Sequence, residues 1–328
     1  MTDVEKDSMK AAIVSRYGSP DVIVIGDAPR PTPAADEVLI RVHATSVTRT
    51  DCGQLRAHPI FMRFFTGLRR PKRTILGLDV AGTVEAVGAG VVSLRPGDRV
   101  FGMCPSRRNG AQADYVCVPA TTVAIMPAAA RFDEAVVCEG AFYADAVLRK
   151  VALEAGDGIL IYGASGAIGT AMVQLAKASG AAVTAVVATP HLDLVRSLGA
   201  DRVVDYTAED FTRLGETFDV VVDAVGKTSF FRCRGLLKPD GMFAATDLGT
   251  WGQNVALMMW STITRRKRVV IAAPTRIGGF VDYLKGLMET GQFRGVIDRT
   301  YPFAEIADAY RYVETGQKVG IVAIDVAE

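Results

Sequence analysis

The 328-residue sequence predicts an α/β protein of two domains, and three observations carry this prediction. The chain is too long for one ordinary hydrophobic core. Its first part, up to about residue 125, holds short apolar runs divided by frequent glycine and proline turns, a pattern typical of a partly open β-barrel. From residue 131 on, apolar strands alternate with helical segments, which indicates a doubly wound parallel sheet covered on both faces.

Each element follows from the local pattern. Apolar runs bounded by turn residues predict strands of the first domain at 9–16, 22–26, 37–44, 77–87, 99–102 and 113–118. Similar runs predict strands of the second domain at 158–162, 182–187, 202–205, 219–225, 241–245 and 269–272. Segments with helical spacing and few breakers predict helices at 132–154, 168–179, 190–198 and 279–291.

The end of the chain is expected to return to the first domain, as a strand at 296–301, a helix at 304–315 and a strand at 320–324. The expected domain boundaries are therefore 1–126 together with 292–328 for the first domain, and 127–291 for the second.

The composition excludes several classes of function. The net charge of +1 provides no general attraction to nucleic acid. No apolar run reaches the ~20 residues that a membrane-spanning helix needs. The five cysteines are scattered and form no Cys-x-x-Cys pair, which indicates reduced thiols and a cytoplasmic protein.

The most informative stretch is the turn Gly163-Ala164-Ser165-Gly166-Ala167-Ile168-Gly169 between a predicted strand and a predicted helix. Glycines let the backbone approach a pyrophosphate, and the N–H groups that begin a helix bind phosphate oxygens. The turn therefore predicts a dinucleotide site with Ser165, Gly166, Ala167 and Ile168 around the phosphates. The alternative is a tight turn in a doubly wound fold of another kind.

Several further motifs occur in a recognisable order, at 77–88, 96–102, 110–116, 164–169 and 198–201. With these motifs the sequence resembles the medium-chain dehydrogenase/reductase superfamily, and most closely its zinc-free quinone-oxidoreductase-like branch. The resemblance implies a GroES-like domain followed by a Rossmann domain that binds a nicotinamide cofactor.

Zinc-dependent members of this superfamily bind the metal through a cysteine and a histidine, and the matching positions here hold Thr48 and Leu78. Neither side chain can replace a thiolate–imidazole pair, so we expect no metal ion. His43 lies within a predicted strand and is interpreted as a locally bonded residue. Without a Lewis acid, the resemblance favours reduction of a conjugated acceptor over oxidation of an alcohol.

The choice of cofactor depends on the end of the second Rossmann strand. NAD-preferring relatives carry a carboxylate at the position of Ala188, and its absence favours NADPH over NADH. Thr189, His191 and Arg196 are the candidate ligands of the 2′-phosphate, and Tyr206 resembles a tyrosine beside the adenosine ribose. Strand-end packing is the alternative for Tyr206, and a solvated helix face is the alternative for Arg196.

Two further strand ends are expected beside the cofactor. Val225 and Gly226 end the fourth strand, and Leu248 and Gly249 follow the fifth, close to the nicotinamide. Ligands of doubly wound sheets gather at such carboxyl ends.

Three residues are the candidates for catalysis. Thr48 takes the place of a family asparagine near the nicotinamide and the substrate oxygen, although a hydroxyl is a poor proton source unless a neighbour lowers its pKa. Asp51 either orients that loop or Arg49, or is a helix N-cap. Tyr143 falls where relatives keep a threonine beside the nicotinamide, and its alternative is packing.

Two apolar segments have no assigned role. Three interpretations are open for the segment 60–70. It forms a flap over a lipophilic substrate, contacts a membrane surface, or packs over its own domain. The loop 254–260 is interpreted as part of the pocket wall, a dimer interface or part of the core. The basic run 265–268 that follows it is expected to be solvated.

The sequence thus predicts a zinc-independent, NADPH-dependent oxidoreductase that transfers hydride to a quinone or an α,β-unsaturated carbonyl compound. Its partner is a small lipophilic substrate, and a homodimer is the possible assembly. Two alternatives stay open. One is an NADPH-binding regulatory or sensor protein without turnover, and the other is a zinc-type alcohol dehydrogenase with displaced ligands.

Overall fold

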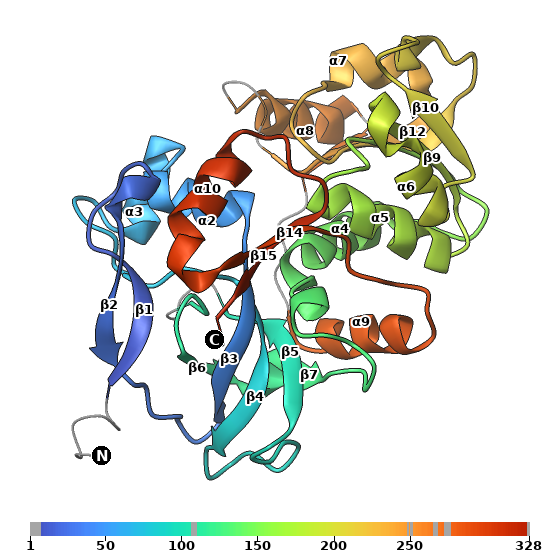
Figure 1. The fold of residues 1–328 in the computed structure, drawn as a ribbon. Helices are drawn as coiled ribbons and strands as arrows, with labels where there is room; N and C mark the ends of the chain where they lie inside the picture. Colours follow the sequence, from blue (N-terminus) through green and yellow to red (C-terminus); the bar gives the residue numbers. More distant parts are fainter. Residues whose placement is uncertain are drawn as a thin grey trace. The chain divides into compact units, whose positions relative to one another are not determined.

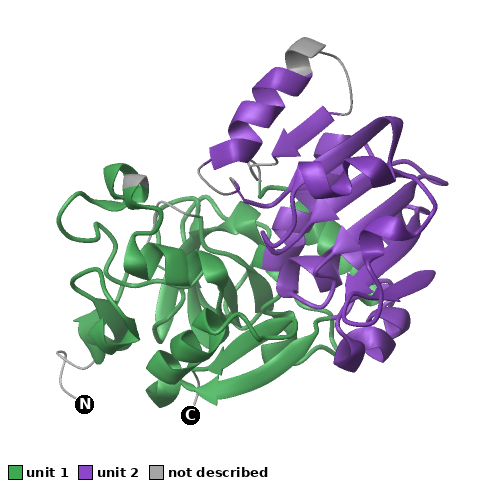
Figure 2. Ribbon diagram, turned by 90° about the horizontal axis from the view of Figure 1, so that it is seen from above, with its two compact units in different colours: residues 1–139, 277–289, 295–328 green, residues 140–276, 290–294 purple. Residues whose placement is uncertain are grey.

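The computed structural model describes residues 8–105, 110–247, 249, 252–264, 268–271 and 277–326. The chain divides into two compact units, shown in green and purple in Figure 2. Unit 1 comprises Met1–Glu139, Ile277–Glu289 and Gly295–Glu328, and unit 2 comprises Gly140–Arg276 and Thr290–Arg294.

Unit 1 is built around a seven-stranded sheet of order β14–β15–β3–β4–β5–β7, in which β6 also pairs with β3. Its strands are β3 (Glu37–Val47), β4 (Asp79–Val87), β5 (Arg99–Met103), β6 (Tyr115–Pro119), β7 (Val123–Ile125), β14 (Ile297–Pro302) and β15 (Ile321–Asp325). A separate hairpin joins β1 (Ser8–Val14) to β2 (Ile23–Pro29). β15 runs antiparallel to β3, so the last strand of the chain completes the first sheet (Figure 1).

The helices of unit 1 lie between its strands in the sequence. They are α2 (Arg49–Arg56), α3 (Arg63–Thr66), α9 (Phe280–Glu289) and α10 (Ile306–Glu314), with short 3-10 turns η1 (Pro20–Val22), η2 (Ile60–Met62), η3 (Ala120–Thr122), η4 (Asp133–Ala135) and η9 (Phe303–Glu305). In α10, Ile306, Ala309, Tyr310 and Val313 recur at helical spacing and are almost fully buried. This single apolar face packs α10 into the core of unit 1.

Unit 2 contains a six-stranded parallel sheet of order β10–β9–β8–β11–β12–β13. The strands are β8 (Gly158–Tyr162), β9 (Ala182–Val187), β10 (Arg202–Asp205), β11 (Phe218–Asp223), β12 (Leu237–Ala245) and β13 (Arg268–Ile271). The chain starts at β8, winds outward to β10, and returns to add β11 on the other side of β8. The order of the strands therefore reverses between β8 and β11, which is where doubly wound sheets bind their ligands.

The helices of unit 2 connect these parallel strands. They are α4 (Cys138–Val151), whose first two residues belong to unit 1, α5 (Ala167–Ala178), α6 (Leu192–Ser197), α7 (Phe230–Cys233) and α8 (Gln253–Thr264), with 3-10 turns η5 (Thr189–His191), η6 (Phe211–Arg213) and η7 (Arg234–Leu236). α5 and α6 contact the β8–β10 half of the sheet, and α7 and α8 contact β12 and β13 (Figure 1). The predicted fold class, a partly open barrel-like domain plus a doubly wound parallel sheet, is confirmed.

Two predicted elements differ from the structure. The helix expected over 132–154 is interrupted, because Val136 has a non-helical ψ of 56° after η4, and the helix proper begins at Cys138. The segment 254–260, expected as a loop, lies inside α8, because no glycine or proline breaks the run from Gln253 to Thr264. None of the described helices is both long and apolar enough to cross a membrane.

Candidate functional site

The turn after β8 has the geometry of a phosphate-binding turn. Gly163 takes a φ of +80°, and a Cβ on Gly169 would lie 2.2 Å from the Gly163 carbonyl oxygen. Only glycine at 169 therefore allows α5 to begin this close to the strand end. Gly166 is the N-cap of α5 and provides no side-chain cap, so the first-turn N–H groups remain available to a bound anion. The residues from Ser165 to Ile168 are all partly exposed.

The parallel register brings the other predicted cofactor residues to the same edge of the sheet. Tyr162 lies opposite both Val186 and Asp223, and Asp223 lies opposite Ala245. The segments that follow these strand ends therefore share the edge that carries the glycine turn. They contain Thr189, His191, Tyr206, Val225, Gly226 and Gly249. Leu248 lies outside the described residues.

Asp223 organises the loop after β11 and was not predicted. Its side chain is almost fully buried and accepts hydrogen bonds from the backbone N–H groups of Val225 (3.1 Å), Gly226 (2.8 Å) and Thr228 (2.8 Å). Burial raises the pKa of this carboxyl, and the backbone donors oppose the shift. The available signal was an acid that ends an apolar strand three positions before a glycine.

The Thr189 side chain forms a hydrogen bond to Asp205, the acidic residue that ends β10. Its hydroxyl donates to Asp205 Oδ2 at 2.6 Å and lies 2.9 Å from the Thr207 hydroxyl. These hydroxyl groups lower the pKa of Asp205, with Thr189 as the largest cause. Arg196 is engaged elsewhere, because its guanidinium pairs with Asp193 at 2.8 Å.

A cavity of about 400 Å³ adjoins this strand end. Its lining includes Tyr162 and Tyr206, whose ring centroids are 5.9 Å apart, and Phe211, which lies 4.9 Å from Tyr162. Arg232 of α7 also lines the cavity, with its guanidinium 5.0 Å from the Phe211 ring centroid. The cavity thus combines aromatic faces with a cation, and the acidic residues Glu209 and Asp210 also line it, with Asp210 4.0 Å from the Arg232 guanidinium. Arg232 was not predicted, since it belongs to no motif.

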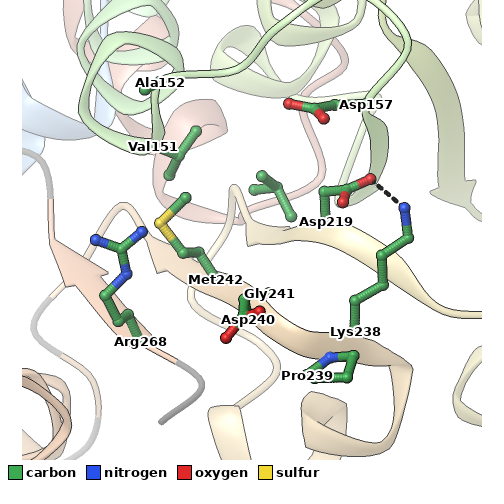
Figure 3. A pocket seen from close by; sticks show the side chains of 11 residues that line it. Val151, Ala152, Asp157, Asp219, Lys238, Pro239, Asp240, Gly241, Met242 and Arg268 are labelled. Atoms are coloured by element: carbon green, nitrogen blue, oxygen red, sulfur yellow. Dashed lines mark hydrogen bonds and ion pairs between the residues drawn. The ribbon is translucent and has the colours of Figure 1, made fainter. Parts of the chain in front are cut away.

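A second cavity of about 450 Å³ lies at the opposite edge of the same sheet (Figure 3). It is lined by residues at or near the amino ends of the strands, among them Asp157, Asp219 and Arg268, and Lys238 pairs with Asp219 at 2.7 Å. None of the predicted cofactor-binding residues that the structure describes lines this cavity, because they follow the carboxyl ends of the strands.

In unit 1, Thr48 and Asp51 form a reciprocal helix cap. The Thr48 hydroxyl accepts from the Asp51 backbone N–H at 3.1 Å and donates to Asp51 Oδ2 at 2.8 Å, while the Thr48 N–H donates to the same carboxylate oxygen. Asp51 also accepts from the Gly77 N–H at 3.1 Å, and burial raises its pKa to about 6. The N-cap of α2 is thus Thr48, with Asp51 at the third helical position, and not Asp51 as one alternative had it.

Thr50, which precedes Asp51 in α2, contacts the buried acid Glu139. Its hydroxyl donates to Glu139 Oε1 at 2.6 Å, and the Glu139 backbone N–H donates to Asp79 Oδ1 at 2.7 Å. Burial raises the pKa of Glu139 to about 7 and that of Asp79 well above its usual value, whereas burial lowers the pKa of Lys318. This pair was not predicted. Its only sequence signal was an acid inside the apolar run from Val136 to Ala141.

Tyr143 lies on α4 and is partly buried, in the portion of the helix that belongs to unit 2. It stands one turn along α4 from Glu139. Thr48 and Asp51 belong to unit 1.

The positions matched to zinc ligands have no ligating character. Leu78 is buried, and the Thr48 hydroxyl is engaged with Asp51. His43 stacks on Phe132 with centroids 4.3 Å apart and shares a 3.2 Å hydrogen bond with Thr83, which agrees with its interpretation as a locally bonded residue. Within the described ranges, no group of three or more His, Cys, Asp or Glu residues could hold a metal ion.

Comparisons with known proteins agree with this geometry. The family profile described as alcohol dehydrogenase GroES-like domain matches residues 34–128, and that described as zinc-binding dehydrogenase matches residues 198–324. A 2-methylene-furan-3-one reductase from Solanum lycopersicum is 32% identical, with 96% of this chain and 79% of the relative covered.

An NADPH-dependent alkenal/one oxidoreductase from Arabidopsis thaliana is similar to the same degree, with 32% identity and the same two coverages. Among solved structures, the quinone oxidoreductase from Coxiella burnetii superimposes with a TM-score of 0.85 at 25% identity, and the match covers 98% of this chain and all of the other.

Proposed function

The chain belongs to the medium-chain dehydrogenase/reductase superfamily, in its quinone-oxidoreductase-like branch, and from this premise we propose that it is an NADPH-dependent, metal-free reductase of quinones or α,β-unsaturated carbonyl compounds. As a member of this superfamily branch, the protein is an oxidoreductase. The observation that carries the proposal is the turn in which Gly169 lies against the Gly163 carbonyl, with the uncapped start of α5 beside it.

We assign the cofactor to the carboxyl edge of the parallel sheet. Ser165, Gly166, Ala167 and Ile168 would bind the pyrophosphate through backbone N–H groups. Val225, Gly226, Leu248 and Gly249 would line the nicotinamide end. In support, the Asn254 Oδ1 atom is buried and has no partner among the described residues, while its Nδ2 donates to Asp247, so this oxygen can accept from the cofactor carboxamide.

We propose NADPH as the cofactor because of the polar groups at the adenosine end. No carboxylate stands at Ala188, and Arg232 and Tyr206 line one cavity, where a guanidinium can pair with a 2′-phosphate. Thr189, His191 and Arg196 remain candidate ligands, with Arg196 requiring release from Asp193. The relative from Arabidopsis thaliana carries NADPH in its name.

The bound cofactor supplies the hydride, and this chain must supply a proton to the reduced acceptor. We assign the proton path to Thr50 and Glu139. The Thr50 hydroxyl donates a proton to the substrate oxygen and regains one from the protonated Glu139 carboxyl. Thr48 and Asp51 hold the first turn of α2, on which Thr50 stands, and Tyr143 is proposed as a further hydrogen-bond donor.

The direct test is stopped-flow absorbance of NADPH bound to the protein, mixed with a panel of quinones and enones. Oxidation of the cofactor by at least one acceptor supports the reductase. Tight cofactor binding without oxidation by any acceptor would favour a regulatory or sensor protein instead.

We further propose a cytoplasmic location and a homodimer. All five cysteines are thiols in the structure. β13 is one of the two edge strands of the parallel sheet in the described part of unit 2, and such an edge can pair with a second copy. The molar mass by light scattering tests the dimer.

A further inference from the structure

We propose that the surface formed by the segment from Ile60 to Lys72 docks this protein on anionic lipid membranes. This interaction surface, here called the Ile60–Lys72 surface, lies wholly in unit 1 and comprises η2, α3 and the turn after them. The inference is independent of the reaction proposed above.

The first observation is a concentration of exposed apolar side chains. Ile60 is 75% exposed, Phe64 and Phe65 are each 73% exposed, and Leu68 is 63% exposed. Four large side chains within nine residues therefore leave their apolar surface in water. Each would lose that contact with water on entering a membrane interface.

The second observation is that contacts with Tyr17 fix the conformation of this segment. The Tyr17 hydroxyl donates to the Gly67 carbonyl at 2.8 Å and lies 2.8 Å from the Thr66 hydroxyl, and the Arg63 guanidinium lies 5.2 Å from the Tyr17 ring centroid. The Lys72 N–H closes the segment on the Thr66 carbonyl at 2.7 Å. Because the polar groups face the protein, the apolar side chains are directed outward, and they do not pack over the domain.

Glycine is required in this closed segment. Gly67 has a φ of +125°, and a Cβ there would lie 2.0 Å from the Arg70 carbonyl oxygen. Directly after this tight turn the chain continues with Leu68, Arg69 and Arg70, which are all exposed, as Phe64 and Phe65 are before it. The surface is thus a defined loop and not an extended tail.

The third observation is the separation of charge. No acidic residue occurs between Asp51 and Asp79, although the chain holds 36 acidic residues in all. The same stretch contains six basic residues: Arg56, Arg63, Arg69, Arg70, Lys72 and Arg73. Arg56 pairs with Glu314, whereas Arg69, Arg70 and Lys72 are exposed and follow Leu68 closely in the chain.

Exposed apolar side chains with a basic border match one kind of partner. Phospholipid headgroups of negative charge attract the border, and the hydrocarbon boundary receives the apolar side chains. Nucleic acid would pair with the arginines but would leave the four apolar side chains in water. The surface is short, so we expect reversible binding and not permanent anchoring.

The test is co-sedimentation of the full-length protein with vesicles of phosphatidylcholine alone or with about 30 mol% phosphatidylserine. We expect binding about tenfold stronger to the anionic vesicles, and loss of that binding in about 0.5 M NaCl. The paired variant Phe64→Ser/Phe65→Ser should reduce binding about tenfold at an unchanged melting temperature. Arg69→Gln/Arg70→Gln should reduce the difference between the two vesicle types.

Matched controls change equally exposed residues elsewhere. Val92→Ser alters a side chain that is 97% exposed in unit 1, and Arg95→Gln/Arg213→Gln removes two exposed arginines. The proposal is overturned if the unaltered protein fails to bind anionic vesicles, or if the controls lose as much binding as the test variants. It is also overturned if Phe64→Ser/Phe65→Ser leaves vesicle binding intact and instead raises the KM for the acceptor, as a substrate flap would.

Discussion

The hydroxyl of Thr50 and the carboxyl of Glu139 share a 2.6 Å hydrogen bond across 89 positions of sequence. The charged and titratable groups around Glu139 are Asp51, Asp79 and Lys318. Because burial raises the pKa of Glu139 to about 7, this acid holds a proton under mildly acidic conditions and releases it near neutrality. The pair therefore has the two properties a proton path needs, contact and a proton that can be exchanged.

Glu139→Gln should change the pH profile of the reaction. Glu139 acts as an acid only below its pKa, so kcat of the unaltered enzyme should fall as the pH rises through about 7. In the variant that fall should disappear, and kcat at about pH 6 should drop at least tenfold. Steady-state rates between about pH 5.5 and 8.5 measure both effects.

The control for this change is Glu134→Gln, which alters a nearby acid that accepts a hydrogen bond from the Arg131 backbone. It should leave the profile unchanged. Thr50→Val should reproduce the loss seen with Glu139→Gln, because the two residues act in series. A pH profile that survives both substitutions would refute the assignment.

The pH dependence of the free energy of unfolding tests the raised pKa of Glu139 independently. The folded pKa of Glu139 lies above its ordinary value of 4.5, so ionisation costs free energy in the folded state. The free energy of unfolding of the unaltered protein should therefore decrease as the pH rises from about 4.5 to about 7. Urea denaturation of Glu139→Gln should show a smaller decrease over that window. An equal decrease in both proteins would contradict the raised pKa.

Thr48→Ala should act on stability more than on the chemical step. It removes the side-chain cap of α2 and should lower the free energy of unfolding by about 1 kcal/mol. Thr48→Ser keeps the hydroxyl and should restore most of this loss. Urea denaturation and kcat, measured on the same samples, separate the roles, and a large fall in kcat at unchanged stability would make Thr48 catalytic.

Arg232→Met should weaken NADPH more than NADH. The guanidinium lines the cavity that holds Tyr206, so its loss should raise the KM for NADPH about tenfold and leave that for NADH within about twofold. Arg213→Met is the matched control, since Arg213 contacts the same Asp210 as Arg232 but does not line the cavity. Equal effects on both cofactors would remove Arg232 from phosphate recognition.

Asp205→Asn should shift cofactor preference in the opposite direction. The Asp205 carboxylate accepts from the Thr189 hydroxyl at 2.6 Å and would repel a 2′-phosphate placed there. Neutralising it should raise the ratio of kcat/KM for NADPH over NADH about tenfold. An unchanged or lower ratio would mean that Asp205 does not face the phosphate.

The parts of this structure that could be predicted from sequence are local. The strand–turn–helix around Gly163 and Gly169 follows from apolar runs and glycine spacing within twenty residues. The residues that were missed depend on distant contacts. The proposed role of Glu139 depends on its hydrogen bond to Thr50, and that of Arg232 depends on the cavity it lines with Tyr206 and Phe211. No short window of sequence contains these pairs. The helix α8 was missed because its apolar run has no clear helical periodicity.

The proposed function rests on transfer of hydride from NADPH to a carbon atom of a conjugated acceptor. The most direct measurement is mass spectrometry of the product formed with NADPH that carries deuterium at both positions of nicotinamide C4. We expect one deuterium on the β-carbon when the acceptor is an enone, while the proton on the α-carbon comes from water. A reduced product without deuterium, or an unreduced enone beside bound NADPH, would contradict it.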